Sequence, residues 1–153
     1  MDLRKVFFKN MEELAKTDGS VMVLVGDLGF SFCEDFAKKY PKQFINCGIA
    51  EQNMVGVAAG LALAGKKPYC YSGSIFLLSR ANEFIRDDVA YNDLDVKLIG
   101  TGASGFLGFT HNFYAERGEN FLKGFPNIVY IEAKNEERLK RALKLKGAMF
   151  IKL

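Results

Sequence analysis

Hydrophobic segments with the pattern of β-strands alternate with helical patterns along almost the whole chain. Short apolar runs bounded by turn residues are typical of strands that are covered on both faces. Six such runs occupy residues 21–26, 44–46, 68–72, 96–100, 128–132 and 148–153. Alternation of this kind predicts an α/β domain with a mostly parallel six-stranded sheet and helices on both faces.

The helical segments between these runs have their own start and stop signals. Asp2 is placed to cap a first helix that reaches Lys16, and Pro41 ends a short helix over residues 31–40. Further helices are predicted over residues 53–65, 75–91, 115–123 and 135–146. We find no internal repeat, linker or low-complexity segment, so the chain is expected to form one domain over residues 1–153.

Loops that follow four of the predicted strands are expected to lie along one edge of the sheet. In open parallel sheets, ligands bind at the carboxyl ends of the strands. These loops follow Gly26, Asn46, Ser72 and Gly100. They contain or approach Asp27, Glu51, Phe76 and His111, which are therefore the first candidates for chemistry.

The helix predicted over residues 53–65 contains no charged residue and is rich in glycine and alanine. A surface helix normally shows an apolar stripe and a charged face, so this one is expected to be buried on nearly every side, against another backbone. Glu51 stands at its start. A buried carboxylate costs free energy unless a specific partner meets it, but an acid in a first helical turn is also favoured by the helix dipole alone. Both interpretations of Glu51 stay open on position alone.

Composition and charge narrow the function classes. A chain of 153 residues is long enough to bury a core, and 49% hydrophobic with 25% charged residues excludes disordered and fibrous proteins. The net charge is only +3, and the basic residues are scattered. The one dense basic run, residues 134–146, has its leucines on one helical face, which favours a solvated amphipathic helix over a nucleic-acid site.

Cysteine and histidine usage gives further limits. Cys33, Cys47 and Cys70 form no CxxC pair, which favours a reducing compartment and argues against disulfides and a zinc site. No secretory signal and no apolar run of about 18 residues is found, so a soluble, cytoplasmic protein without membrane contact is expected. His111 is the single histidine, which makes a histidine-based metal site within the chain improbable. A thiolate pair of Cys47 with His111 is a weaker hypothesis than a small buried cysteine.

A glycine motif after the fourth predicted strand needs separate treatment. Gly100, Gly102 and Gly105 spell GxGxxG, but a dinucleotide fingerprint should follow the first strand and open a helix. The segment SGFLGFTHN that follows is no helix start. The loop is therefore interpreted as an active-site or interface loop, and no GxxxxGK[ST] phosphate-binding loop exists in the chain.

The segment GIAEQNMVGVAAGLALAGKKP resembles the signature of the pyrimidine-binding domain of transketolase-type thiamine diphosphate enzymes. The resemblance continues through FLLSRANEFIRDDVAYNDLDVKLIGT, the pair Thr110-His111 and FPNIVYIEAKNEE. In order and spacing it covers about residues 21–153, nearly the whole chain.

The resemblance implies a role for each candidate. The glutamate matching Glu51 hydrogen-bonds N1′ of the cofactor's aminopyrimidine ring and favours the tautomer that removes the thiazolium C2 proton. Phe76 matches an aromatic residue against which that ring rests, and His111 matches a histidine near substrate and cofactor. The same resemblance assigns Asp27, Ile49 and Arg80 to the cofactor site.

Departures from the family pattern limit the prediction of the substrate. Gly73 stands where the family often has a second aromatic residue. The loop over residues 101–111 is shorter than usual and lacks a histidine at Gly102 and an acidic-glycine pair, groups that read sugar hydroxyls in transketolases. Cofactor chemistry is therefore expected, while the ketose specificity stays open.

The family also needs domains that this sequence does not contain. We find no GDG-type metal motif with a downstream asparagine, and neither the diphosphate-binding nor the C-terminal domain is expected in this chain. The prediction is a pyrimidine-binding subunit of a split transketolase-like enzyme, acting on sugar-type substrates with thiamine diphosphate. A separate subunit would supply the diphosphate and Mg²⁺ site, in an α2β2 assembly. The alternatives are a split 2-oxo acid decarboxylase or carboligase, a non-catalytic regulatory subunit, and a free-standing nucleotide-binding module.

Overall fold

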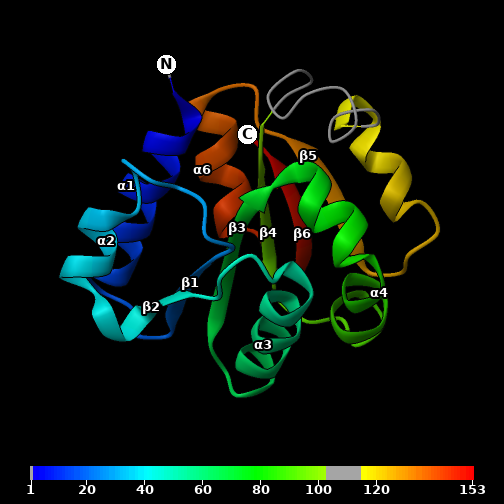
Figure 1. Ribbon diagram of the computed structural model, residues 1–153, viewed down its shortest axis with the longest axis horizontal. Coiled ribbons are helices and arrows are strands. Elements are labelled where there is room, and N and C mark those ends of the chain that lie inside the picture. Colours follow the sequence, from blue (N-terminus) through cyan, green and yellow to red (C-terminus); the bar gives the residue numbers. More distant parts are fainter. Residues whose placement is uncertain (1, 103–114) are drawn as a thin grey trace.

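The computed structural model describes residues 2–102 and 115–153, with only the backbone of residues 115–117. Within these residues, six strands form one sheet in the order β2-β1-β3-β4-β6-β5, and every neighbouring pair is parallel (Figure 1). The strands are β1 (Val21–Val25), β2 (Phe44–Asn46), β3 (Lys67–Gly73), β4 (Lys97–Thr101), β5 (Ile128–Glu132) and β6 (Ala148–Lys152). The predicted α/β fold with a parallel six-stranded sheet is confirmed.

The longer α-helices of the described residues are α1 (Leu3–Ala15), α2 (Glu34–Lys39), α3 (Glu51–Leu63) and α6 (Glu136–Lys144). Two of them begin at side-chain caps. The Asp2 carboxylate accepts a hydrogen bond from the Arg4 backbone N–H at 3.0 Å, and Asn135 Oδ1 accepts one from the N–H of Arg138 at 2.9 Å. Such caps satisfy backbone donors that a helix start leaves unpaired. Short 3₁₀ helices, η1 (Pro41–Gln43) and η4 (Ala115–Leu122), complete the connections.

The segment after β3 departs from the predicted continuous α-helix over residues 75–91. It is divided into a π-helix η2 (Phe76–Arg80), a short α4 (Asn82–Phe84) and a second π-helix η3 (Ile85–Ala90). Several side chains bond to backbone oxygens of this segment. Ser79 Oγ donates to Ile75 O at 2.6 Å, Asn82 Nδ2 to Leu78 O at 3.0 Å and Asn92 Nδ2 to Asp87 O at 2.8 Å. Side-chain bonds of this kind compete with the regular helical ladder and bend it. The prediction of a single continuous α-helix over residues 75–91 is therefore wrong.

The sheet separates two hydrophobic cores (Figure 1). Helices α1, α2 and α6 cover one face, and α3, η2 to η3 and η4 cover the other. Side chains of a strand alternate between the faces, so in β1 Val23 joins the first core whereas Leu24 joins the second. Both cores contain fully buried aromatic side chains, Phe7 in the first and Phe150 in the second.

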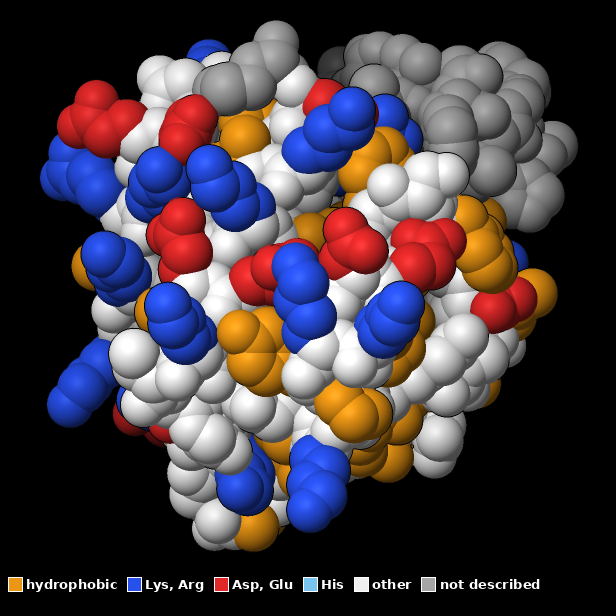
Figure 2. All heavy atoms as spheres, turned by 90° about the vertical axis from the view of Figure 1, so that its left-hand side faces the viewer, with side chains coloured by type: hydrophobic (Ala, Val, Ile, Leu, Met, Phe, Trp, Pro, Cys, Tyr) orange, Lys and Arg blue, Asp and Glu red, His pale blue; other side chains and the backbone are white. Residues whose placement is uncertain are grey.

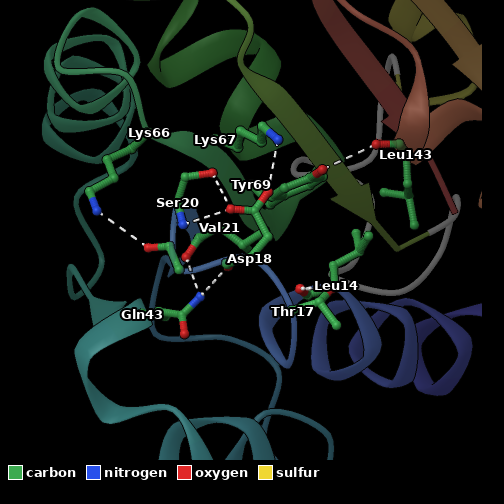
Figure 3. A network of polar contacts seen from close by, with 11 residues as sticks. Leu14, Thr17, Asp18, Ser20, Val21, Gln43, Lys66, Lys67, Tyr69 and Leu143 are labelled. Atoms are coloured by element: carbon green, nitrogen blue, oxygen red, sulfur yellow. Dashed lines mark hydrogen bonds and ion pairs between the residues drawn. The ribbon is translucent and has the colours of Figure 1, made fainter.

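The amino ends of the central strands are joined by a polar network (Figure 3). Gln43 Nε2 donates to the backbone oxygens of Asp18 at 3.0 Å and Val21 at 2.9 Å. Lys67 Nζ pairs with the Asp18 carboxylate at 2.8 Å. Hydrogen bonds from Lys67 and Ser20 hold the pKa of Asp18 well below its usual range. These contacts connect the turn before β1 to η1 and to the start of β3, so they stabilise the fold at this edge of the sheet.

Positively and negatively charged side chains are mixed on the face of the protein that Figure 2 shows. On the face turned to the viewer in Figure 2, Lys and Arg side chains lie among Asp and Glu side chains. One ion pair of this kind, Lys39 Nζ with Glu12 at 2.7 Å, joins α2 to α1. A nucleic-acid surface would instead gather one sign of charge. In the part of the chain that the structure describes, no helix combines the length and apolar character needed to cross a membrane.

Candidate active site

The carboxyl ends of four strands meet at one edge of the sheet, as the sequence predicts. In the register of the sheet, Val25 of β1 lies beside Asn46 of β2 on one side and Tyr71 of β3 on the other. Gly73 of β3 pairs in turn with Thr101 of β4. The segments that follow these strands therefore share an edge, which is the side of a parallel sheet where ligands bind.

Glu51 is the first residue of α3 and is buried at this edge, with 2% of its surface exposed. Its two carboxylate oxygens have different partners. Ser72 Oγ donates to Oε1 at 3.0 Å, and Arg80 Nη1 donates to Oε2 at 3.2 Å. The positive end of the helix dipole also favours an anion at this position. Both interpretations of Glu51 therefore apply, since the carboxylate is in a first turn and is also met by specific partners.

Arg80 joins Glu51 to Phe76. The central carbon of the Arg80 guanidinium lies 3.8 Å from the centroid of the Phe76 ring. A cation over an aromatic face within about 6 Å is attracted by the ring quadrupole. Arg80 is partly exposed, with 40% of its side-chain surface accessible, whereas Phe76 is half-buried. One planar cation therefore contacts an aromatic face and a buried carboxylate at the same time.

Two glycines let these side chains approach the backbone. A Cβ at Gly26 would lie 2.9 Å from Ser72 Oγ and 3.5 Å from Glu51 Oε1. A Cβ at Gly73 would lie 2.9 Å from Cδ2 of Phe76. Real Cβ atoms essentially never come within 3.0 Å of another atom, so a side chain at Gly26 would displace Ser72 and one at Gly73 would displace the Phe76 ring. Gly73, a departure from the family pattern, is thus the surface on which the Phe76 ring lies.

Asp27 lies next to this cluster, at the end of β1, and is paired with Asn46 from the end of β2. Asn46 Nδ2 donates to Asp27 Oδ1 at 3.1 Å, while Asn46 Oδ1 accepts from the backbone N–H groups of Asp27 at 3.2 Å and Gly48 at 3.0 Å. Asp27 has a positive φ of 53°, a conformation that aspartate tolerates better than most residues. The pair fixes the two strand ends relative to each other.

The remaining predicted site residues are Ile49 and His111, of which the structure describes only Ile49. Ile49, in the turn between β2 and α3, is 74% exposed, so its side chain points away from the protein core. His111 lies outside the described residues, as does most of the loop over residues 101–111. The hypothesis of a thiolate pair with His111 is therefore not tested, although burial raises the pKa of the half-buried Cys47 thiol. Among the described residues, no group of three or more His, Cys, Asp or Glu could bind a metal ion.

Sequence reasoning missed two polar residues of this edge, Ser72 and Asn46. Both are the polar residues at the carboxyl ends of short apolar strands, the position from which side chains reach a site in a parallel sheet. That position is the signal that could have identified them. The structure brings together Glu51, Phe76 and Arg80 of the predicted set.

Comparison with known proteins agrees with this arrangement. Residues 1–149 match the family described as the transketolase pyrimidine-binding domain. The chain belongs to this family. The resemblance drawn from the AEQ segment and from the residues after β3 is therefore confirmed, and Glu51 stands in a pyrimidine-binding domain.

Relatives of this pyrimidine-binding domain include proteins described as sections or subunits of transketolases. A putative transketolase C-terminal section from Methanocaldococcus jannaschii is 35% identical over 99% of this chain and 50% of its own length. One subunit of the apulose-4-phosphate transketolase from Phocaeicola vulgatus is 35% identical over 93% of this chain and 46% of its own. The chain spans about half the length of these relatives.

Solved structures support the same fold. A split-gene transketolase, described as an inactive β4 tetramer, superposes with a TM-score of 0.85 at 34% identity, over 98% of this chain and 50% of its own. Transketolase from Campylobacter jejuni superposes with a TM-score of 0.81 at 19% identity, over 97% of this chain and 25% of its own. The second likeness shows the fold alone.

Proposed function

We propose that this chain is the pyrimidine-binding subunit of a split transketolase-like enzyme that transfers a two-carbon ketol unit between sugar or sugar-phosphate substrates. The observation that supports this most directly is the buried Glu51 carboxylate at the start of α3, which Arg80 joins to the face of Phe76. Relatives described as a transketolase C-terminal section and as a subunit of apulose-4-phosphate transketolase support the same assignment.

The residues at this edge fit the aminopyrimidine ring of thiamine diphosphate. Arg80 provides the test of fit, because its flat guanidinium already lies on Phe76 and donates to Glu51. The same two groups would accept a flat heteroaromatic ring with a hydrogen-bond donor on its edge. When bound, thiamine diphosphate supplies a carbon nucleophile and an electron sink for the transfer.

Glu51 is the residue to which we assign the proton chemistry of this subunit. Its carboxylate would accept the hydrogen bond from N1′ of the ring, in a site where few waters compete because the group is buried. Ser72 keeps Oε1 in place through its 3.0 Å hydrogen bond. Phe76 would pack against the ring, while Ile49, Asp27 and His111 are proposed for the site from the family resemblance only.

A partner subunit would complete the site from the other side. We propose that it supplies the diphosphate and Mg²⁺ binding groups and joins this chain in an α2β2 assembly. Helix α3 has a face suited to such a contact, because Met54, Val55, Ala58 and Ala59 are buried in this chain whereas Gly60 and Leu63 are exposed. Leu63 is 74% exposed and no charged residue lies near it on the helix. An uncharged, exposed helix face is typical of a protein interface.

The test is reconstitution. The purified chain is mixed with its partner subunit, thiamine diphosphate and Mg²⁺, and transfer from a ketose donor to an aldose acceptor is measured. We expect turnover from the mixture and none from either chain alone. Glu51→Gln should remove turnover and leave assembly intact, as measured by sedimentation.

Glu137→Gln is the matched control, since Glu137 is also an acid in a first helical turn but is exposed, in α6. It should leave turnover unchanged. Full activity of Glu51→Gln would contradict the role given to this carboxylate. Turnover with 2-oxo acid donors in place of ketoses would instead favour the decarboxylase or carboligase alternative, and a mixture that binds the cofactor without turnover would favour a regulatory subunit.

A further inference from the structure

The Arg80 side chain makes two contacts that the site would need for a bound ring. Its guanidinium lies 3.8 Å above the Phe76 ring centroid, and its Nη1 donates to Glu51 Oε2 at 3.2 Å. A guanidinium is planar, delocalised and a hydrogen-bond donor along its edge. A 4-aminopyrimidine is also planar and carries a comparable N–C–N edge. The two groups therefore require the same aromatic face and the same carboxylate oxygen.

We propose that Arg80 occupies the aminopyrimidine position of the site and that the ring can bind only after this guanidinium has moved away. The inference rests on the function proposed above and adds a regulatory step to it. Two flat groups stacked on one side of Phe76 and bonded to one oxygen exclude each other sterically. Arg80 is then a competitor of the ring, in contrast to its assignment as a cofactor ligand from the sequence.

Arg80 is attached in a way that permits such a movement. With 40% of its side-chain surface accessible, the guanidinium has solvent beside it. It is the last residue of the π-helix η2, and the chain changes to α4 two residues later. Arg80 is the accessible member of this ion pair, so water can solvate the guanidinium as soon as it leaves the buried Glu51 carboxylate. Release of Arg80 into water is therefore not prevented by the fold.

Glu51 would keep hydrogen-bond partners while the ring replaces Arg80, a step called the exchange below. When Arg80 leaves, Ser72 Oγ still donates to Oε1, and the start of α3 still favours an anion. Only Oε2 loses its partner, and an incoming ring would supply a new donor to that atom. The buried carboxylate would thus remain paired before and after the exchange, which avoids the cost of an unpartnered buried charge.

The consequence is a lower apparent affinity for the ring. When only a fraction of molecules has the binding position free, the apparent dissociation constant rises by the inverse of that fraction. Removing the guanidinium should therefore tighten binding. If Arg80 were a ligand of the ring, its removal would weaken binding, so the two roles predict opposite signs.

The experiment titrates the full chain with 4-amino-5-hydroxymethyl-2-methylpyrimidine and follows amide chemical shifts by NMR. We expect Arg80→Ala to bind this probe about tenfold or more tightly than the unmodified chain. Arg80→Lys should be intermediate, because an ammonium can pair with Glu51 but has no flat face to stack on Phe76. Arg86→Ala is the control, since Arg86 is exposed and pairs with its neighbour Asp87 at 2.7 Å; its affinity should be unchanged.

A second readout follows Arg80 itself. Its guanidinium should react faster with phenylglyoxal, measured by peptide mass spectrometry, when the probe is present. Equal or weaker binding by both Arg80 variants, or protection of Arg80 by the probe, would overturn the inference. Absence of binding by all proteins, also after each is mixed with the partner subunit, would overturn the proposed pyrimidine site itself, which separates the failure of the function from the failure of the exchange. Should Arg80→Ala not fold, the probe titration of Arg80→Lys and the phenylglyoxal assay of the unmodified chain decide the question.

Discussion

The hydroxyl of Ser72 donates a hydrogen bond of 3.0 Å to Glu51 Oε1 and so links the end of β3 to the start of α3. Both side chains are buried, Ser72 fully and Glu51 to all but 2%. A buried carboxylate oxygen that loses a donor keeps its desolvation cost. This single bond therefore contributes to the stability of the domain and to the position of the proposed catalytic carboxylate.

Replacing Ser72 by alanine should lower the free energy of unfolding by about 1–3 kcal/mol, because Glu51 Oε1 is left without this donor in a buried position. Urea denaturation of the purified chain measures the change. Ser79→Ala serves as the control, since Ser79 is exposed and its hydroxyl only bonds back to Ile75 O within its own helix. Equal effects of the two substitutions would show that the bond to Glu51 has no special value.

Gly100 should not tolerate a side chain. A Cβ at this position would lie 2.4 Å from Cζ of Phe150 and 2.6 Å from Ser74 Oγ. Gly100→Ala should cost about 1–3 kcal/mol through overpacking of the second core. The decrease in the midpoint of thermal unfolding, Tm, measures this loss of stability.

A second substitution tests whether steric overlap causes that loss of stability, and a glycine substitution at an open position gives the contrast. Adding Phe150→Leu to Gly100→Ala should recover part of the stability, because the ring atoms in the way are removed. In contrast, Gly60→Ala in α3 should stabilise the isolated chain by up to about 1 kcal/mol, since a Cβ there would meet nothing within 4 Å. A double variant no more stable than Gly100→Ala would contradict the steric explanation.

A charge on the exposed face of α3 should weaken assembly without unfolding the chain. Leu63 is 74% exposed, so Leu63→Lys should change the free energy of unfolding by less than about 0.5 kcal/mol. Affinity for the partner subunit, measured by isothermal titration calorimetry, should fall at least about tenfold, because a lysine would be buried against an apolar surface. Leu145→Lys, at another exposed leucine after α6, should leave the affinity unchanged. Undiminished affinity of Leu63→Lys would remove α3 from the interface.

The thiol of Cys47 should be alkylated slowly at neutral pH. Burial raises its pKa above the ordinary value of a free cysteine, and the thiolate is the reactive form. Its rate with iodoacetamide should therefore keep rising with pH beyond about 8.5, where a free thiol begins to level off. Quantitative mass spectrometry of the Cys47 peptide against free glutathione gives the comparison. A pH profile displaced to lower pH would instead indicate an activated thiolate of the kind considered with His111.

The parallel sheet could be predicted because each strand is a short apolar run, which indicates burial on both faces. Bounds moved by one or two residues, as at the last strand, which ends at Lys152 and not at Leu153. The edge shared by Asp27, Glu51 and Phe76 followed from the rule for parallel strands alone. Family resemblance added the expected roles, and the match of residues 1–149 to the pyrimidine-binding domain confirmed the family.

Two features could not be predicted from the sequence: the winding of residues 75–91 and the contact of Arg80 with Glu51. Residues 75–91 have helical periodicity, yet they form two π-helices separated by a short α-helix. Phe76 and Arg80 are four residues apart, a spacing that brings side chains together on a helix, but no spacing rule predicts that Arg80 would also reach Glu51.

Strand β3 gives one further consequence, through the opposite directions of two successive side chains. Tyr71 packs behind the sheet, stacked on Phe7 with ring centroids 5.7 Å apart and close to Phe8 at 5.1 Å. Ser72, the next residue, points forward to Glu51. Aromatic packing under α1 therefore supports, through the backbone of β3, the carboxylate on the other side. Substitutions at Phe7 and Phe8 should therefore displace Glu51, although neither ring lies on the side of the sheet where Glu51 is found.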